Sequence, residues 1–371
     1  MIMMGLYSMN AIPFGDILIH GLVRDSKGRK MSKSLGNTLD PLELSEKHGA
    51  DALRFSLIEK ANPGQDVPFD EEWTQAAKKF GNKIWNAAKF IHIYTEGLED
   101  RNLTKVELNE NRWILNEFNT CLEEFNKLFN EYKISDAYKL LYNFLWSDLF
   151  DWYFEFSKNL VDNENYKDET QKVLLNVFLN SIKILNPAMP HLTEEIWSTF
   201  NDELIIDSSW PSNFDIKFSD KGEFDDLKSI INQIRNFKSN YNLKNNLVLD
   251  VVKQSNYPEW YDNQLESIAK INVLDVDTER KSKDKILTFQ SGKVVFEISA
   301  NKYIDIQSEI KRLSQKIEKL GKSLDVSKNR LENDKFVKNA KEELIEEEKA
   351  NIEKLSSEIE TIQKTLSSLD N

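Results

Sequence analysis

Cysteine is almost missing from this sequence, because Cys121 is the only one among 371 residues. A single thiol excludes an intrachain disulfide and a zinc site built from four cysteines. We therefore expect no zinc, no other metal-binding site and a reducing, cytoplasmic environment.

Positive charge is also in short supply. The chain has 49 lysine and arginine residues against 62 aspartate and glutamate residues, which gives a net charge of -13. This balance argues against a protein that coats nucleic acid through its overall field. Any contact with RNA must be confined to a local basic patch.

The sequence has no long uninterrupted apolar run. The apolar start Met1 to Leu6 lacks a basic lead and Pro13 follows soon after, so we interpret it as interior sequence and not as a secretion signal. The richest apolar segment, residues 138–156, contains four charged residues that would be costly in a bilayer: Lys139, Asp148, Asp151 and Glu155. We expect no membrane-spanning segment and no membrane partner.

The length predicts two to four domains, and the residue pattern predicts a mainly α chain. An apolar run at residues 17–19, between two glycines, predicts a short strand buried on both faces, and residues 24–37 must form a loop. A helix is expected to begin at Asp40, which can cap it, and to end near Gly49. We assign residues 1–61 to this first part.

Residues 62–218 predict an α-helical bundle. Apolar residues recur at spacings of three and four along residues 73–91 and 118–132, as they do on the buried face of a helix. Nine aromatic residues lie between Tyr138 and Phe156, on nearly all faces of the helix expected there. Two explanations are open: a helix at the centre of the bundle, which we favour, or a platform on which nucleic-acid bases stack.

The helix around residues 173–185 must end at Asn186 and Pro187, because proline disfavours its continuation, and another is expected from Thr193. Residues 219–300 then predict a small α+β unit. It should contain a helix and four strands, with a hairpin turn at Ser291-Gly292: helix 227–237, and strands 247–252, 271–276, 286–289 and 294–298.

Residues 301–371 carry the most regular pattern, two runs of apolar residues at heptad spacing. When the tail is folded back on itself, the two runs face each other in pairs such as Leu313 with Ile362. This symmetry predicts an antiparallel coiled-coil hairpin that turns near residues 337–338, with arms of roughly 45 Å at 1.5 Å per residue. The alternative is an ordinary solvated coiled coil that holds a partner protein.

Basic residues gather in the first loop. Residues 24–33 contain one acid, Asp25, and five basic side chains: Arg24, Lys27, Arg29, Lys30 and Lys33. Phosphoryl or adenylyl transfer builds charge on phosphate oxygens, and lysines on a mobile loop flanked by Gly28 and Gly36 can close on that charge. The loop predicts a polyphosphate site, with a solvated surface loop as the simpler alternative.

The surroundings of this loop resemble one family. His20 to Asp25, followed by Gly28 to Asn37 with its Lys30-Met31-Ser32-Lys33-Ser34 run, resembles the second signature of class I aminoacyl-tRNA synthetases. The resemblance implies that residues 1–61 are the terminal piece of a Rossmann-like catalytic fold. It also implies that Lys33, supported by Lys30, binds ATP with its Mg²⁺ and stabilises the transition state in which an amino-acid carboxylate attacks the α-phosphate. Met31, Ser32 and Ser34 are expected to complete the ATP-binding loop.

Later motifs resemble the anticodon-binding bundle of the members specific for branched aliphatic amino acids. They are Phe80 to Ala87, Asp151 to Tyr153 and Pro190 to Trp197. By this resemblance Lys83 and Trp85 contact the anticodon of tRNA. The alternative is a surface lysine and a core tryptophan.

The tail resembles the coiled-coil arm with which valine-specific members reach the tRNA elbow. Residues 328–341 carry five basic side chains against two acidic ones, so Arg330, Lys335 and Lys338 are expected to contact tRNA. The resemblance implies activation of valine with ATP and its transfer to tRNA-Val. Isoleucine or leucine specificity is the alternative, although isoleucine enzymes usually carry cysteine-bound zinc that this chain cannot build.

One signature of the family is missing. Class I synthetases carry a His-x-Gly-His motif that contacts the ATP phosphates, and none of the four histidines stands in such a motif: His20, His48, His92 and His191. We therefore expect a C-terminal fragment that is inactive alone. We also expect the chain to be a monomer. The alternative function is a stand-alone tRNA-binding module without catalysis.

Overall fold

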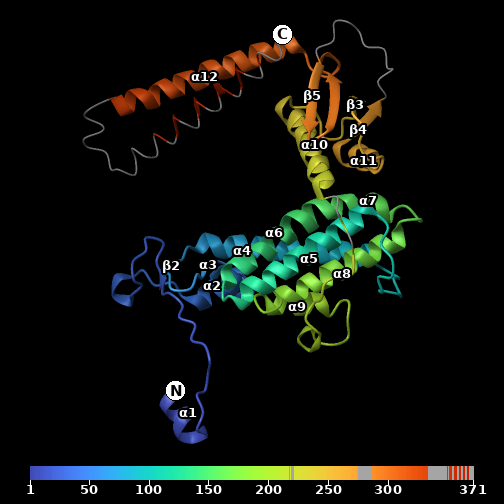
Figure 1. Cartoon of the computed structure of the whole chain (residues 1–371). Coiled ribbons are helices and arrows are strands. Elements are labelled where there is room, and N and C mark those ends of the chain that lie inside the picture. The colour runs from blue at the N-terminus through green and yellow to red at the C-terminus, as the bar shows by residue number, and fades with distance from the viewer. Residues whose placement is uncertain are drawn as a thin grey trace. The chain divides into compact units, whose positions relative to one another are not determined.

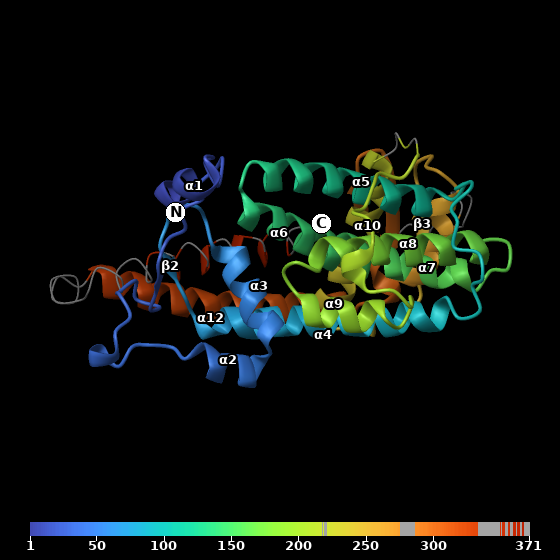
Figure 2. The same cartoon turned by 90° about the horizontal axis from the view of Figure 1, so that it is seen from below.

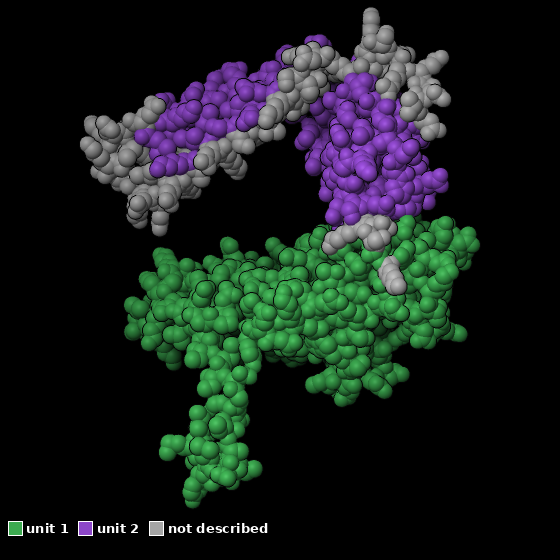
Figure 3. Space-filling model, in the orientation of Figure 1, with its two compact units in different colours: residues 1–221 green, residues 222–371 purple. Residues whose placement is uncertain are grey.

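The computed structural model describes residues 1–216, 218, 221–274 and 286–332, and ten positions beyond them: 349, 351, 352, 355, 356, 359, 360, 362, 363 and 366. Within these residues the chain is mainly α-helical with two small sheets, as predicted (Figures 1 and 2). It forms two compact units, residues 1–221 and residues 222–371 (Figure 3). None of the described helices is both long enough and apolar enough to cross a membrane.

Most side chains in the first part of the chain are exposed to solvent. Helix α1 (Ile2–Met9) has no buried residue, and residues 17–19 form no strand and are largely exposed. The prediction of a strand buried on both faces is therefore wrong. Such a strand needs neighbouring strands and helices on both faces, whereas the local sheet pairs just two residues, β1 (Val23–Arg24), in parallel with β2 (Val67–Pro68).

Two helices follow the loop, α2 (Pro41–His48) and α3 (Ala50–Lys60). The start of α2 is confirmed, because the Asp40 carboxylate accepts a hydrogen bond from the Leu42 amide at 2.8 Å and proline occupies the first turn. Gly49, with a φ of 99°, ends α2 and leads directly into α3. A single residue therefore joins the two helices.

A helical bundle fills the rest of the first unit. Its members are α4 (Glu71–Tyr94), α5 (Asn109–Asn130), α6 (Ile134–Asn143), η2 (Phe144–Tyr153), α7 (Phe154–Val161), α8 (Lys167–Leu185) and α9 (Pro190–Trp197). Helices α4, α5, α8 and α9 run side by side in Figures 1 and 2, and α8 and α4 both contact α9. Their buried faces carry mostly apolar side chains, so the hydrophobic effect holds the bundle together.

The predicted apolar stripes follow these buried faces in most places. The stripe on α4 is buried from Ala77 to Ile91, as predicted, whereas its first residue, Trp73, is half-buried. The stripe on α5 is buried as far as Phe125, but Phe129 and Tyr132 are exposed. The difference arises because Phe129 lies in the last turn of α5 and Tyr132 follows the helix.

The single thiol is closed off from solvent. Cys121 lies on the buried face of α5, and burial, with a contribution from the Asp148 and Glu117 carboxylates, raises the pKa of the thiol to about 12. The thiol is therefore protonated and unreactive at neutral pH.

The aromatic segment runs through α6, η2 and α7 as consecutive helices, of which η2 is π-helical. Most of its rings are buried, among them Tyr138, Phe144, Tyr153 and Phe156, so core packing explains them better than a stacking platform. The π-helical segment η2 cannot be predicted from the sequence pattern, because it alters the side-chain spacing only locally.

Helix α8 ends at Leu185, as predicted. The next helix, α9, begins at Pro190, three residues before the predicted start at Thr193. Proline fits the first turn of a helix, where its missing N–H would have no partner in any case. A short 3-10 turn, η3 (Ile205–Asp207), follows.

The second unit packs α10 (Lys221–Asn240) with a four-stranded sheet in the order β4–β3–β6–β5. The other elements are β3 (Leu249–Lys253), α11 (Trp260–Gln264), η4 (Leu265–Ala269), β4 (Ile271–Leu274), β5 (Ile286–Ser291), β6 (Val294–Ser299) and η5 (Ala300–Lys302). The predicted helix and strands are confirmed with small shifts of their ends; β3 begins at Leu249, two residues later than predicted, and residues 275 and 276 lie outside the described residues. The hairpin turn is formed by Gly292 and Lys293, one residue later than predicted.

A buried lysine holds the start of two strands. Lys238 of α10 is 2% exposed, and its ammonium donates hydrogen bonds to the carbonyl oxygens of Leu247 and Ala269, both at 2.7 Å. The carbonyls of Asn245 and Lys270 lie at 3.4 and 3.2 Å. Because these residues precede β3 and β4, one side chain fixes the ends of both strands to α10.

Helix α12 (Ile306–Glu332) begins the tail. Leu313 and Ile362 form a small buried cluster with neighbouring apolar side chains. The predicted turn at residues 337–338 lies outside the described residues. The antiparallel coiled-coil hairpin stays a prediction, and so does the division of the chain at residues 61, 218 and 300.

Candidate functional site

The lysine loop, residues 24–37, is closed at its base by Asp25. Oδ1 of Asp25 accepts hydrogen bonds from the amides of Lys27 at 3.1 Å and Arg29 at 2.7 Å, and Oδ2 pairs with the Arg29 guanidinium at 2.8 Å. The Gly28 amide donates to the Asp25 carbonyl at 2.8 Å, in a turn whose φ of 73° favours glycine. The first half of the loop is thus wrapped around one carboxylate.

Asn37 fastens the far end of the loop. Its Nδ2 group donates to Asp25 Oδ2 at 2.9 Å and to the Lys30 carbonyl at 3.2 Å, and its Oδ1 accepts from the Ser32 amide at 2.9 Å. One amide side chain therefore bonds to three points of the loop. The two ends stay together while the residues between them project.

Asp25 is held in its ionised form. The hydrogen bond from Asn37, followed by those from the Arg29 amide and guanidinium, lowers the pKa of the carboxyl well below its usual 3.8 against the opposing effect of burial. Because the folded-state pKa is depressed, the stability that these bonds contribute is present above about pH 4 and is lost as the pH falls. The base of the loop is therefore insensitive to pH near neutrality.

Lys33 lies in the helical turn η1 (Lys33–Leu35), which ends at Gly36 with a φ of 62°. The side chains of Lys30 and Lys33 are exposed. Within the described part of the chain, neither ammonium group has a hydrogen-bond or ion-pair partner. Free ammonium groups on a fastened loop can bind an anionic ligand such as a polyphosphate.

The other three residues expected to bind ATP lie beside these lysines. The hydroxyl oxygens of Ser32 and Ser34 are 3.2 Å apart, and Met31 is half-buried. Two hydroxyls next to two ammonium groups provide donors for phosphate oxygens. The residues present are therefore compatible with a bound triphosphate.

The lysine loop is anchored to β2 through Asp66. One oxygen of this carboxylate accepts a hydrogen bond from the Leu22 amide at 2.8 Å, and the other pairs with the Arg24 guanidinium. These two contacts, the Leu22 bond first, lower the pKa of Asp66. The amides of Val67 and Phe69 donate to the carbonyls of Leu22 and Arg24 and complete the pairing of β1 with β2.

Gly21 lies where this anchor leaves no room for a side chain. A Cβ at Gly21 would lie far inside van der Waals contact of the Gln65 backbone. We expect Gly21→Ala to loosen β1 from β2 and to raise the hydrogen-exchange rates of the Val67 and Phe69 amides roughly tenfold, because overpacking costs about 1–3 kcal/mol. Gly15→Ala is the matched control, since nothing lies within 4 Å of that Cβ position. Equal exchange rates in the two variants would contradict the prediction.

Glu71 joins the loop-bearing segment to the bundle. This residue of α4 pairs with Lys47 and lies 2.8 Å from Nε2 of His48, both at the end of α2. These contacts, that of Lys47 first, lower the pKa of the Glu71 carboxyl. The His48 side chain is buried, so α2 is fixed against the start of α4.

Asp51 makes a second junction, between α3 and α9. Its carboxylate accepts hydrogen bonds from the Leu192 amide at 2.7 Å and the Arg54 guanidinium at 3.0 Å, and lies 2.9 Å from Nδ1 of His191. Asp51 and His191 are 140 residues apart, and the sequence does not predict their contact. A signal does exist, because α9 begins after Met189, which has no side chain that can cap a helix.

A cavity of about 350 Å³ lies next to the base of the loop. It is lined by Asp25, Ser26, Lys27, Arg29, residues 36–39 and residues 69–71. Lys30 and Lys33 do not line it. The cavity is therefore not the place where their ammonium groups would meet a phosphate.

Lys83, expected at the anticodon, is already engaged within the bundle. Its ammonium lies 2.6 Å from the Asp151 carboxylate, donates to the Trp146 carbonyl at 3.3 Å and lies 3.7 Å from the centre of the Trp146 ring. Tyr142 stacks on the same ring. Contact with RNA would require these bonds to be exchanged, so a role for Lys83 in tRNA binding stays a prediction.

Trp85 is half-buried, so its side chain is less exposed than a typical RNA contact and more exposed than a typical core residue. It lies in a recess of about 120 Å³ between α4 and α9 that is lined by Trp85, Ala88, Lys89, His92, Ile196 and Thr199. The Lys89 ammonium lies 5.8 Å from the centre of the Trp85 ring. We call this the α4–α9 recess. Lys89 and His92 were not predicted, although their spacing of four and seven from Trp85 places them on one helix face.

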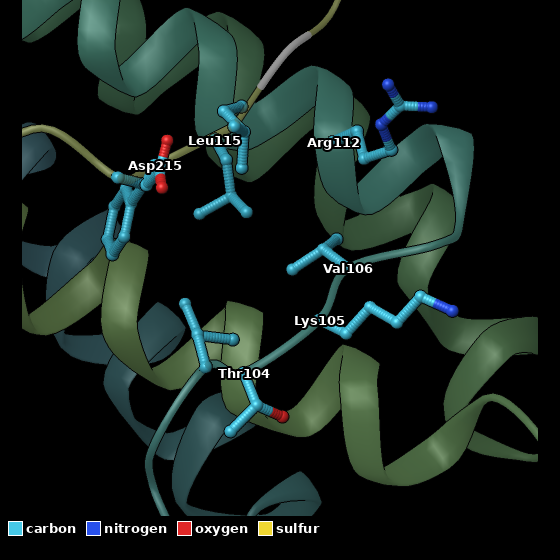
Figure 4. A pocket seen from close by; sticks show the side chains of 9 residues that line it. Thr104, Lys105, Val106, Arg112, Leu115 and Asp215 are labelled. Atoms are coloured by element: carbon cyan, nitrogen blue, oxygen red, sulfur yellow. The ribbon is translucent and has the colours of Figure 1, made fainter.

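A larger cavity of about 450 Å³ lies beside α5 (Figure 4). Val106 and Leu115 point into it, whereas the charged ends of Lys105 and Arg112 point away. The Arg112 guanidinium lies 5.9 Å from the centre of the Phe218 ring. Because the cations that could orient a ligand are turned outward, we assign this cavity no ligand.

The tail contributes one described residue to the expected tRNA contacts. Arg330 is exposed in the last turn of α12, whereas Lys335 and Lys338 lie outside the described residues. Among the residues that the structure describes, no group of three His, Cys, Asp or Glu side chains could hold a metal ion. The expected absence of zinc stays a prediction.

Three family models match the chain. The class I tRNA synthetase model (I, L, M and V) matches residues 1–70, the anticodon-binding domain of tRNA ligase matches residues 111–253, and the valyl tRNA synthetase tRNA binding arm matches residues 305–370. The first includes the lysine loop, the second most of the bundle and the third the tail.

Curated relatives match over almost the whole chain. A valine–tRNA ligase from Petrotoga mobilis is 37% identical over 94% of this chain and 42% of its own length. Valine–tRNA ligases from Pseudothermotoga lettingae and Bacillus subtilis are 35% and 32% identical over 100% of this chain and over 43% and 44% of their own lengths. The chain thus spans less than half the length of the curated relatives it matches.

Proposed function

We propose that this chain, which belongs to the valine–tRNA ligase family of class I aminoacyl-tRNA synthetases, supplies the ATP-facing loop and the tRNA-binding parts of a valine-activating enzyme. The observation that carries the proposal is the lysine loop, whose base is fastened by Asp25 and Asn37 while Lys30 and Lys33 project. The proposed enzyme is a cytoplasmic monomer without zinc or a membrane partner.

In the proposed first step, the carboxylate of valine attacks the α-phosphate of ATP, pyrophosphate leaves and valyl-adenylate forms. Negative charge grows on the phosphate oxygens in the transition state, and the ammonium of Lys33, with that of Lys30, stabilises it. Met31, Ser32 and Ser34 complete the loop around the nucleotide. Mg²⁺ that arrives with ATP neutralises part of the same charge.

In the second step, the terminal ribose of tRNA-Val attacks the carbonyl carbon of the adenylate, and AMP leaves. We assign the anticodon to the α4–α9 recess, where Trp85 offers a ring for stacking and Lys89 and His92 offer polar groups. The elbow of the tRNA is assigned to the tail, at Arg330, Lys335 and Lys338.

We divide the chain into four proposed domains. Residues 1–61 are the terminal piece of the Rossmann-like catalytic fold, residues 62–218 the anticodon-binding bundle and residues 219–300 a connecting unit. Residues 301–371 form the antiparallel coiled-coil arm, and the buried cluster of Leu313 and Ile362 supports its pairing.

Reconstitution tests the proposed function. The 371-residue chain is combined with the part of the Petrotoga mobilis valine–tRNA ligase that it does not match, as a second polypeptide or as a covalent fusion, and valine-dependent exchange of pyrophosphate into ATP is measured. We expect exchange by the combination and none by this chain alone, because β1 and β2 are too short to form a nucleotide-binding sheet. A folded fusion without exchange would contradict the function, and exchange by the chain alone would contradict its dependence on the other part.

A second candidate function is tRNA binding without catalysis. The family models favour it, because those that match residues 111–253 and 305–370 both describe parts that bind tRNA. In that case the chain binds tRNA-Val, but the covalent fusion shows no pyrophosphate exchange. Binding of tRNA-Val by the chain and pyrophosphate exchange by the fusion, measured together, therefore separate the two functions.

Trp85→Ala tests the assignment of the anticodon. We expect binding of tRNA-Val to weaken roughly fivefold to 150-fold, because stacking of one base on an aromatic ring is worth about 1–3 kcal/mol. The dissociation constant is measured with a labelled transcript at one fixed salt concentration. Ile93→Ala is the control, since Ile93 is an exposed apolar residue of α4 that does not line the recess. Equal affinities of the two variants would remove Trp85 from the contact.

A further inference from the structure

The segment that carries the lysine loop is attached to two helices, and these two helices line the same recess. Glu71 of α4 bonds to Lys47 and His48 of α2, and Asp51 of α3 bonds to the first turn of α9. The α4–α9 recess takes its walls from both α4 and the end of α9. A ligand in the recess therefore contacts both helices to which the loop is attached.

Helix α9 is a short connector with a different contact at each end. It has eight residues, about 12 Å at 1.5 Å per residue. Its first turn presents Leu192 and His191 to Asp51, and its last turn presents Ile196 to the recess. A Cβ at Gly81 would lie 3.4 Å from the Leu192 side chain, so α9 also packs closely on α4. A displacement of Ile196 is consequently passed to the groups that Asp51 holds.

The Asp51 carboxylate is shielded from solvent and bonded to several partners. The side chain of Asp51 is 11% exposed, and its two oxygens meet an amide, an imidazole and a guanidinium. A carboxylate at a helix N-terminus is stabilised by the free amides and the helix dipole. Because α9 follows Met189 and has no side-chain cap of its own, the cap comes from α3. Movement of α9 must either break this bond or move α3.

We propose that Asp51 is a positioning residue that transmits occupancy of the α4–α9 recess by tRNA to the lysine loop; this inference rests on the proposed function. Helix α3 follows α2 through Gly49 alone, and α2 is capped by Asp40, three residues after Asn37 fastens the loop. Restraint of α9 by bound RNA is passed through Asp51, α3 and α2 to the loop. The loop then becomes less mobile before ATP is used.

Hydrogen exchange in the full chain tests this coupling. The probe is an RNA hairpin with the anticodon arm of tRNA-Val, which lacks the acceptor end that could cover the loop directly. We expect the hairpin to slow exchange in peptides from residues 24–40 about fivefold, the lower end of usual coupling between sites. In Asp51→Asn the slowing should disappear, while the affinity for the hairpin changes by less than about twofold.

Two further variants keep the test decisive. Asp136→Asn is the matched control, because Asp136 is an exposed carboxylate in the first turn of α6 that pairs only weakly with Lys139, at 3.6 Å; its response should equal that of the wild type. His191→Ala removes one mostly exposed partner and leaves the Leu192 bond, so it should lose part of the response even if Asp51→Asn fails to fold.

The outcomes separate the coupling from the function on which it rests. If the wild-type chain does not bind the hairpin, the proposed tRNA partnership and the coupling both fall. If the hairpin binds but loop exchange stays the same, the coupling alone is overturned. It is also overturned if His191→Ala and every folded Asp51 variant slow the loop as much as the wild type does.

Discussion

Lys33→Ala is expected to lower valine-dependent pyrophosphate exchange by the reconstituted enzyme about 100- to 1000-fold. Removal of one preorganised donor to the charge of a transition state typically costs that factor. The Lys33 ammonium is exposed, and none of the described residues pairs with it, so its loss should leave the stability of the chain unchanged. Initial rates over ranges of ATP and valine give kcat and KM separately, and the loss should appear mainly in kcat.

Lys27→Ala is the control for Lys33→Ala. Lys27 is an exposed lysine of the same loop whose backbone amide, and not its ammonium, bonds to Asp25. The substitution removes the same charge from the same loop, so we expect less than about a threefold loss. Equal losses in the two variants would mean that the loop acts through its net charge and would contradict the role of Lys33. Lys30→Ala should fall between them.

Lys238→Met is expected to destabilise the second unit by about 2–4 kcal/mol at pH 7. The substitution leaves the buried carbonyl oxygen of Ala269 and the part-buried one of Leu247 without a donor, and a buried acceptor without a partner costs about 1–3 kcal/mol. Loss of a buried charge offsets part of this cost. Urea unfolding of the full chain measures the loss of stability. Hydrogen exchange of peptides from β3 and β4 then reports the stability of the second unit separately from that of the first. Lys244→Met, at an exposed lysine of the adjoining loop, should change little.

The pH dependence of this effect has a definite sign. Burial, and then repulsion from Lys270 and Arg235, lowers the pKa of Lys238 from 10.5 to about 8. Between these two values the unfolded chain binds more protons than the folded chain, so the free energy of unfolding rises with pH. The difference in unfolding free energy between the wild type and Lys238→Met should therefore be constant below about pH 8 and widen from pH 8 to 10. A difference that narrows over this range would contradict the assignment.

Local signals in the sequence predict elements well where one residue decides the outcome. Asp40 followed by Pro41 fixes the start of α2, and Pro187 fixes the end of α8. The strand at residues 17–19 fails for the opposite reason. Its burial depends on neighbouring strands and covering helices, and the described chain supplies only the two residues of β2 as a partner for β1.

The candidate site shows the same difference between features set by the local sequence and features set by distant residues. Lys30 and Lys33 follow from a contiguous motif, which the sequence displays directly. The contacts that hold the motif in place join residues that are far apart: Asn37 with Asp25 across 12 positions, and Asp51 with His191 across 140. A carboxylate in the sequence does not reveal which distant donor it will meet, because that depends on how the helices pack.

The burial of Cys121 has a practical consequence for observing the loop. Its protonated thiol lies in the core, so a maleimide dye reacts with it poorly at neutral pH. An introduced cysteine such as Ser26→Cys, at an exposed position of the lysine loop, can then be labelled without removal of the native one. A single dye at that position would report the movement of the loop in real time as ATP or RNA is added.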